Sequence, residues 1–408
     1  MLDKQLHNRR RLVRELYFAP VLSCAEFSEK IGKSLPLATR MLMEGLEEGI
    51  VQENGLAPST GGRRPVTYSL QSGSMYLVSV AMDQFVTRIA LMDTHNHPVG
   101  RVEKMELPLA GNPEALNQLA GHIARFVEGT GIPKEKIAGI GIGMPGFVDV
   151  RKGINHSFLK TPRGITITGV VAEKTGLPVY IDNDSSLIAL AELRFGGARE
   201  RKNAMVINIG WGVGLGIVVN GTLFRGHNGF AGEFSHIPLF SNGKMCSCGK
   251  TGCLETETSL QILVQKARAG LTNGRISQLK AEALDHYESA SESMIEAARE
   301  GDRYTMELIS EAAYHIGRGV SILIHLMNPE LVILSGRGAA AGKVWLPAMQ
   351  QAINEHSIPR IAADTAIELS GLGYQAELIG AAALVMEHFG EDAPEKTNRS
   401  EATASLHI

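Results

Sequence analysis

The sequence has few cysteines and no long apolar run. Four of its 408 residues are cysteines, and no apolar stretch approaches the roughly 20 residues that a membrane-spanning helix needs. The N-terminus is charged and lacks the apolar segment of a secretory signal, which argues against structural disulfides. We therefore expect a cytoplasmic protein with no membrane insertion.

The sequence also lacks a large net charge, although its charges are unevenly distributed. The formal net charge is -3, and the apolar content of 44% is enough for two or three domains with cores. Residues 1–73 carry ten Lys and Arg against eight Asp and Glu, so the remainder is net acidic. Arg9 to Arg11 form one basic cluster, and Arg63 and Arg64 form a second. The first cluster is a candidate for phosphate contact, with a solvated helix face as the alternative.

Three of the four cysteines lie close together with one histidine. Cys246, Cys248 and Cys253 follow His236 in a twenty-residue run that ends at Glu255. Three thiolates and one imidazole suit a tetrahedral zinc ion and leave no open position for catalysis. We therefore expect one structural Zn2+ per chain. The alternative is a set of packed core cysteines beside an unrelated histidine; a disulfide is disfavoured because Cys246 and Cys248 are too close to pair comfortably.

The first 73 residues have the pattern of a small helical module. One helical segment ends at Pro20, and a second helix begins at Ser23, where Glu26 completes a capping-box pattern. A third helix begins at Ser34 and ends near Gly49. Two short helices joined by a Gly-containing turn predict a helix-turn-helix, whose second helix enters the major groove of DNA.

The third helix carries the polar side chains that we expect to contact DNA, which are Ser34, Thr39 and Arg40. Met41 and Met43 on the same helix are expected to pack rather than to read bases. Cys24, in the preceding helix, is expected to be a small buried apolar residue.

Two short apolar segments after this helix predict a strand pair around a polar loop. The segments are 50–51 and 66–70, and the loop between them contains a Gly-Gly-Arg-Arg-Pro sequence at 61–65. In extended form, this sequence could place Arg63 and Arg64 in a narrow A·T-rich minor groove. The alternative is a solvated hairpin tip or linker. Because it follows a helix-turn-helix pattern, the segment favours a winged helix-turn-helix that binds DNA.

Beyond residue 74 the pattern changes to alternating strands and helices, which predicts an α/β fold. We expect strands at 76–81, 87–92, 137–143, 179–181, 204–209 and 331–334, and helices at 113–128, 186–195 and 304–327. Gly-rich turns follow the strands that end at 143 and 209. The polar tail at 391–408 is expected to be disordered.

Several motifs resemble those of the ROK family, which contains repressors and sugar kinases. They are Gly232-Glu233-x-x-His236, Cys246-x-Cys248-Gly249-x-x-Gly252-Cys253-Leu254-Glu255, Asn183-Asp184 and Gly61-Gly62-Arg63-Arg64-Pro65. The cysteine motif is highly specific, whereas Gly-rich turns alone are a weak signal. The resemblance covers nearly the whole chain, and the N-terminal extension is similar to that of the repressor branch.

The resemblance implies a winged helix-turn-helix followed by a two-lobed, actin-like (ribonuclease H-like) sugar-kinase fold. The implied domains are 1–73 for DNA binding, 74–184 for the first lobe, completed by about 370–390, and 185–369 for the second lobe, with the zinc loop and an oligomerisation surface. The resemblance also implies that five side chains bind a hexose: Asn183, Asp184, Glu233, His236 and Glu255. Carboxylates and amides suit this role because they accept hydrogen bonds from sugar hydroxyls or donate to them. His236 would serve both the sugar and the metal.

A sugar kinase also needs a base and a phosphate-binding loop. Asp184 matches the position of the family's base, but the family's Asp-x-Gly-x-Thr turn corresponds to Ala81, Asp83 and Phe85 here. In a second loop, Trp211 replaces a hydroxyl-bearing residue. An acidic side chain would repel a triphosphate, and phosphoryl transfer depends on positioning and charge stabilisation. We therefore expect no enzymatic activity and no catalytic residue, with Asp184 as a vestige of the base.

These observations predict a sugar-responsive transcriptional regulator, most simply a repressor of carbohydrate-utilisation genes. It would bind operator DNA as a homodimer or homotetramer and respond to a sugar or a sugar phosphate. One alternative is an ATP-dependent, hexokinase-like sugar kinase with a DNA-binding extension. Another is a regulator whose effector is a partner protein, such as a sugar-transport protein.

Overall fold

The computed structural model describes residues 2–57, 64–241 and 243–390. The stretch Ser72–Val385 forms one compact unit, and the other described residues form a second. Arg63 and the tail at 391–408 lie outside the described residues. None of the helices among the described residues is both long enough and apolar enough to cross a membrane.

The N-terminal unit contains three helices and a small antiparallel sheet. The helices are α1 (Leu2–Phe18), α2 (Cys24–Lys30) and α3 (Leu35–Glu47), and the strands are β1 (Leu22–Ser23), β2 (Val51–Leu56) and β3 (Val66–Leu70), in the order β1-β3-β2. The predicted capping box of α2 is confirmed, because Ser23 accepts from the backbone N–H of Glu26 while the Glu26 carboxylate accepts from Ser23. Leu12, Leu16, Phe27 and Leu42 are among the buried residues of this unit.

Two expectations about side chains in this unit were wrong. Met41 is buried in the core, but Met43 is 47% exposed, because it lies on the outward face of α3. Cys24 is only partly buried, and its Sγ lies 3.2 Å from Oγ1 of Thr39. The position of Cys24 at the first turn of α2 places it at the surface of the unit rather than in its core.

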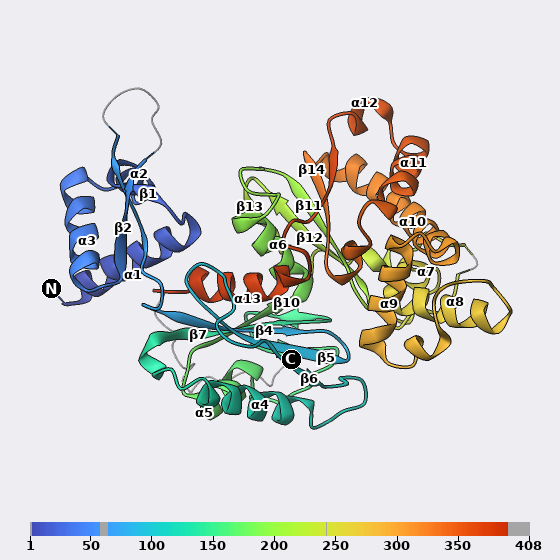
Figure 1. Ribbon diagram of the computed structural model, residues 1–408, viewed down its shortest axis with the longest axis horizontal. Coiled ribbons are helices and arrows are strands. Elements are labelled where there is room, and N and C mark those ends of the chain that lie inside the picture. Colours follow the sequence, from blue (N-terminus) through green and yellow to red (C-terminus); the bar gives the residue numbers. More distant parts are fainter. Residues whose placement is uncertain (1, 58–63, 242, 391–408) are drawn as a thin grey trace, which may run out of the picture. The chain divides into compact units, whose positions relative to one another are not determined.

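The first lobe of the larger unit is a five-stranded sheet in the order β10-β7-β4-β5-β6. Its strands are β4 (Tyr76–Met82), β5 (Val86–Met92), β6 (Glu103–Glu106), β7 (Ile137–Met144) and β10 (Val179–Asn183). β4, β5 and β6 form an antiparallel meander, whereas β7 and β10 add in parallel on the other side of β4. The helices α4 (Ala115–Gly129) and α5 (Ile167–Thr175) lie on one face of the sheet and α13 (Ala376–Glu387) on the other (Figure 1). A small ribbon of β8 (Val148–Asp149) and β9 (Ile154–Asn155) follows β7.

The second lobe repeats this plan with a sheet in the order β13-β12-β11-β14-β15. Its strands are β11 (Ala204–Ile209), β12 (Val213–Val219), β13 (Thr222–Leu223), β14 (Leu331–Ser335) and β15 (Ala366–Leu369). Its helices are α7 (Glu255–Thr258), α8 (Leu260–Thr272), α9 (Tyr287–Arg299), α10 (Arg303–Met327), α11 (Leu346–His356) and α12 (Pro359–Ala362) (Figure 1). β11 and β14 are buried along their whole length, as continuous apolar runs predict.

The helix α6 (Asp184–Phe195) leads from the last strand of the first sheet to the second lobe, where it packs on β12 and β11. We expected this helix to begin at Ser186, but it begins two residues earlier. The reason is local: Asn183 Oδ1 accepts from the backbone N–H of Ser185 and of Ser186, which makes Asn183 the N-cap. The turn at Asn183-Asp184 is thereby fixed at the boundary of the two lobes.

Candidate functional site

A cavity of about 500 Å³ lies between the two lobes, within the size range of small-molecule sites. The structure brings the five expected sugar-binding residues together at this cavity, because all of them line it: Asn183, Asp184, Glu233, His236 and Glu255. They come from the β10–α6 junction, from the loop after β13 and from the start of α7. These residues are up to 72 positions apart in sequence, so only the tertiary fold assembles them.

Asn183 and Asp184 stand at the carboxyl end of β10. The amide of Asn183 is already engaged, because besides capping α6 it donates from Nδ2 to the carbonyl of Gly146 at 3.1 Å. Asp184 accepts from the backbone N–H of Ser185 at 2.7 Å and from Nδ2 of Asn208 at 3.4 Å. Burial raises the pKa of Asp184 to about 7, and the neighbouring carboxylates of Asp83 and Glu233 add to this rise.

Glu233 is positioned by a glycine that no other residue could replace. Gly232 has φ +99°, and a Cβ at this position would lie 2.3 Å from the carbonyl oxygen of Leu215. The turn carries Glu233 to the cavity and continues into a short 3-10 helix, Phe234–His236. Burial raises the pKa of Glu233, and Oε2 of Glu233 lies 3.7 Å from Nε2 of His236. A ligand in the cavity could therefore donate hydrogen bonds to two carboxyl groups, those of Asp184 and Glu233.

His236 and the three cysteines of the motif form one cluster. The ligand atoms of His236, Cys246, Cys248 and Cys253 all lie within 4.8 Å of one another. Sγ of Cys246 lies 3.5 Å from Nδ1 of His236, and the Sγ atoms of Cys248 and Cys253 are 3.6 Å apart. Tetrahedral zinc with ordinary bond lengths would require about 3.5 Å for the first distance and about 3.8 Å for the second. The donor set and its spacing therefore fit a metal ion.

The loop that carries the cysteines is held by its own backbone. Cys246 N–H donates to the carbonyl of Lys250, and Gly249 N–H donates to the carbonyl of Cys246. Gly252 has φ +77°, and a Cβ there would lie 2.0 Å from the carbonyl oxygen of Phe240. Burial raises the pKa of the Cys253 thiol to about 12, and its hydrogen bonds with the neighbouring thiols contribute. Because metals bind thiolates, a metal at this cluster would displace protons.

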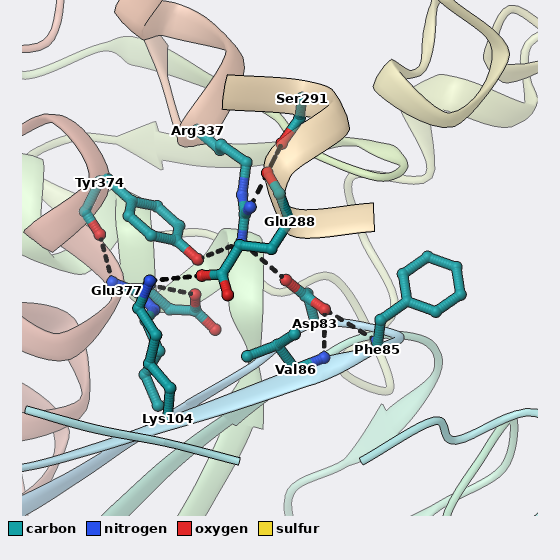
Figure 2. Close-up of polar contacts among 10 residues, drawn as sticks. Asp83, Phe85, Val86, Lys104, Glu288, Ser291, Arg337, Tyr374 and Glu377 are labelled. Carbon is teal, nitrogen blue, oxygen red and sulfur yellow. Dashed lines mark hydrogen bonds and ion pairs between the residues drawn. The ribbon is translucent and has the colours of Figure 1, made fainter. Parts of the chain in front are cut away.

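The cavity is also lined by Asp83, Arg337 and Tyr374, the first of which belongs to the turn that we expected to correspond to the family's phosphate loop. Oδ1 of Asp83 accepts from the backbone N–H of Phe85 and of Val86, both at 2.8 Å, and so closes the β4–β5 turn. Oδ2 of Asp83 accepts from Nη2 of Arg337 at 3.2 Å. Figure 2 shows Arg337 reaching from the second lobe to Asp83, with Ser291 and Tyr374 as further partners. We call this group, Asp83 with Arg337 and Tyr374, the clasp.

Further contacts flank the clasp. The rings of Phe85 and Trp211 meet edge to face with their centroids 5.4 Å apart, and Trp211 is buried. Arg88 pairs with Glu377 at 3.3 Å, and its guanidinium lies 3.5 Å from the ring centroid of Tyr374. Burial raises the pKa of Glu377 to about 8, and the nearby charges of Asp184 and Asp83 add to this rise despite the favourable charge of Arg88.

Sequence reasoning identified Asp83, Phe85 and Trp211 but missed their partners. Arg337 lies between two glycines after a predicted strand, but sequence reasoning assigned no role to it or to Tyr374. An arginine between two glycines at the end of a buried strand was the available clue, because strand ends of α/β folds converge on ligand sites.

The expected DNA-contacting residues of α3 are exposed. Ser34, Thr39 and Arg40 all lie on the surface of the N-terminal unit, and Arg40 makes an exposed ion pair with Glu44 at 3.7 Å. Arg64 is also exposed, but its guanidinium donates to the hairpin backbone, to the carbonyls of Ala57 at 2.5 Å and Leu56 at 3.1 Å. Sequence reasoning did not anticipate this second use of Arg64.

Comparison with known proteins places these features in context. The ROK family profile matches residues 84–388. A glucokinase of Halalkalibacterium halodurans is 33% identical over 305 residues, which cover 74% of this chain and 92% of that protein. A xylose repressor of Caldicellulosiruptor bescii is 29% identical over 402 residues, which cover 94% of this chain and 96% of that protein.

Solved structures show the same likeness. A crystal structure of a ROK family transcriptional regulator, described as a homologue of the Escherichia coli MLC protein, superposes with a TM-score of 0.74 at 25% identity. The match covers 95% of this chain and 97% of that one. The fold is therefore the α/β sugar-kinase-like fold of this family. With a family match over three quarters of its length, the two-lobed cavity and the His-Cys cluster, the chain belongs to the ROK family.

Proposed function

We propose that this protein is a sugar-responsive, DNA-binding transcriptional regulator, most simply a repressor of carbohydrate-utilisation genes. The observation that carries the proposal is the extent of the likeness. The alignment with a xylose repressor includes the N-terminal unit, whereas the alignment with a glucokinase covers only 74% of the chain. A sugar kinase has no evident use for the additional unit.

In this proposal residues 1–73 are a winged helix-turn-helix. α2 and α3 supply the two helices, and the β2–β3 hairpin supplies the wing. Ser34, Thr39 and Arg40 contact the major groove, because they are exposed along α3, which stands as the second helix of the motif. Arg63 and Arg64 contact the adjacent minor groove, with the hydrogen bonds of Arg64 to the hairpin backbone as its resting arrangement.

The effector is a sugar that binds at the cavity between lobes 74–184 and 185–369. Asp184, Glu233 and Glu255 offer acceptors to its hydroxyls, Asn183 holds the turn that presents Asp184, and His236 joins the sugar to the metal loop. The metal is a structural Zn2+ held by His236, Cys246, Cys248 and Cys253, which the spacing of their ligand atoms supports. The protein binds its operator as a homodimer or homotetramer.

Sugar can change DNA binding only if it binds one arrangement of the lobes more tightly than another. Residues from both lobes line the cavity, so closing the lobes on a sugar adds contacts that an open form lacks. The lobe arrangement that sugar favours changes the spacing of the DNA-binding units in the oligomer. The same coupling would serve an effector protein such as a sugar transporter.

The test begins with selection of DNA sequences from a random duplex library by the full-length protein. Fluorescence anisotropy then measures affinity for the enriched sequence with and without glucose, xylose or N-acetylglucosamine. We expect one enriched sequence with two-fold symmetry and a change in its affinity with at least one sugar. Failure to enrich any sequence would refute the proposal, and enrichment without any sugar effect would favour a protein effector.

A second candidate function is sugar phosphorylation, which the likeness to a glucokinase and the position of Asp184 favour. The clasp argues against it. Asp83 would face the nucleotide phosphates, and the Phe85–Trp211 pair fills space beside them. Phosphoryl transfer depends on a cradle of backbone and cationic groups, and such a cradle would require these side chains to leave.

A further inference from the structure

The two arginines that line the cavity are already committed to partners within the protein. Arg337 is buried and has four partners, namely Asp83, Ser291, Tyr374 and the face of Trp211. Arg88 is likewise buried and bound to Glu377 and to the carbonyl of Tyr374. A guanidinium so enclosed exchanges its partner for a ligand only if the ligand compensates for all the contacts that are lost.

Asp83 is also fixed in place. Its Oδ1 holds the β4–β5 turn through two backbone N–H groups, so its Oδ2 cannot swing away from Arg337 without opening the turn (Figure 2). The clasp therefore joins the β4–β5 turn of the first lobe to the turn after β14 in the second. A second interlobe ion pair, Lys104 with Glu288 at 2.5 Å, lies outside the cavity lining and reinforces the same side.

The charge of the cavity wall disfavours an anion. Among the described residues that line it, five are acidic and two are arginines, and both arginines are paired with acids of this set. The formal charge of these five acids and two arginines is therefore negative. A sugar phosphate in the cavity would meet these carboxylates, that of Asp83 among them, and both arginines of the lining are already paired. Like charges without a counterion are an effective means of rejecting a ligand.

We propose that the clasp of Asp83, Arg337 and Tyr374 sets the ligand class of this cavity: an uncharged sugar is accepted, and the same sugar carrying a phosphate is rejected. This inference rests on the proposed sugar-binding function. It assigns a selectivity role to Asp83 and Arg337 rather than to the sugar-binding carboxylates.

The experiment is isothermal titration of the full-length protein with matched pairs of ligands. The pairs are glucose with glucose 6-phosphate, mannose with mannose 6-phosphate, and N-acetylglucosamine with N-acetylglucosamine 6-phosphate. For the sugar that binds, we expect its phosphate to bind at least about tenfold more weakly. A phosphate that binds as tightly as its parent sugar, or more tightly, would overturn the inference and leave the regulator proposal intact. If none of these sugars and phosphates binds, the inference falls, while the DNA-selection experiment still tests the regulator proposal.

Variants locate the selectivity. Asp83→Asn keeps an oxygen for the N–H groups of Phe85 and Val86 but removes the charge opposite Arg337, so the preference for the uncharged sugar should narrow by about tenfold. In the double variant Asp83→Asn with Arg337→Met, the preference for the uncharged sugar should return, because the guanidinium that Asp83→Asn leaves unpaired is then absent. Glu288→Gln is the matched control, since it breaks the other interlobe ion pair outside the cavity lining and should leave the ratio unchanged. An unchanged ratio in Asp83→Asn would refute the role of the clasp, and thermal melts establish that each variant is folded.

Discussion

At the scale of single residues, Asp184 has an environment that differs strongly from that of a surface carboxylate. It lies among Asp83, Glu233 and Glu377, and burial raises its pKa from 3.8 to about 7. A carboxyl group with a raised pKa in the folded state binds a proton that the unfolded chain releases. The folded protein is therefore favoured by protonation at this site, the reverse of an ordinary salt-bridged aspartate.

This environment predicts a stability that falls as pH rises. The contribution of Asp184 is fully present below its unfolded pKa and is lost progressively as pH increases from about 4 to about 7. Asp184→Asn stays uncharged, so it should reduce the slope of the free energy of unfolding against pH in this window. The reduction should correspond to up to about one bound proton. Denaturant unfolding of wild type and variant across pH measures the difference, and identical slopes would contradict the raised pKa.

The His-Cys cluster gives a second prediction at this scale. We expect about one zinc per chain by elemental analysis. Cys246→Ser should lose the metal and lower the Tm by roughly 5 to 10 °C, because a structural site contributes directly to folding. Cys24→Ser is the matched control and should change neither quantity, since Cys24 belongs to the N-terminal unit. Purified wild-type protein without zinc, together with an unaltered Cys246→Ser variant, would refute the site.

At the scale of elements, α3 is the helix on which the proposed DNA recognition depends. Its buried face, with Ala38, Met41, Leu42 and Gly45, fixes its rotation in the unit. Thr39, Arg40 and Met43 are exposed on the rest of the helix, and Ser34 is exposed at its N-cap. The apolar spacing that forms the helix thus also determines which side chains remain available to bases.

Arg40 should read bases rather than only phosphates. Arg40→Ala is expected to cost roughly 1 to 3 kcal/mol at the selected operator and to relax preference at one base position. Arg9→Ala is the comparison, because Arg9 lies on α1 and pairs with Glu48, so its loss should affect all sequences alike. Competition binding against single-base operator variants distinguishes the two. A uniform loss in Arg40→Ala would assign it to the phosphate backbone.

At the scale of the whole molecule, the two lobes have a sugar-kinase-like fold and are joined by the clasp. Asp83, Phe85 and Lys104 of the first lobe each contact a partner in the second, respectively Arg337, Trp211 and Glu288. These two ion pairs and the aromatic contact hold the two lobes together.

This arrangement predicts no appreciable ATP-dependent phosphorylation of hexoses. A coupled assay with glucose, mannose and N-acetylglucosamine should stay well below about 1 per second, the low end of typical enzyme rates. Turnover at or above that rate, abolished in Asp184→Asn, would instead establish the kinase function. The comparison with Asp184→Asn separates this chemistry from a contaminating kinase.

The sequence by itself determined the local structure and the inventory of ligands. The capping box at Ser23, the continuous apolar strands β11 and β14, and the donor set of the His-Cys motif all follow from neighbours within a few positions. Such features depend on short-range hydrogen bonds, periodicity and spacing, which the order of residues specifies directly. The start of α6 was misplaced by two residues because the cap at Asn183 went unrecognised.

Only the tertiary structure decided which distant side chains meet. Asp83 and Arg337 are 254 positions apart, and no spacing rule links them. Sequence reasoning saw an isolated acidic residue where phosphate was expected, whereas the fold gives that residue a buried cationic partner from the other lobe. An ion pair of this kind arises where the two lobes pack against each other. Its formation therefore depends on where the strand ends of each lobe lie in space and not on the local sequence pattern.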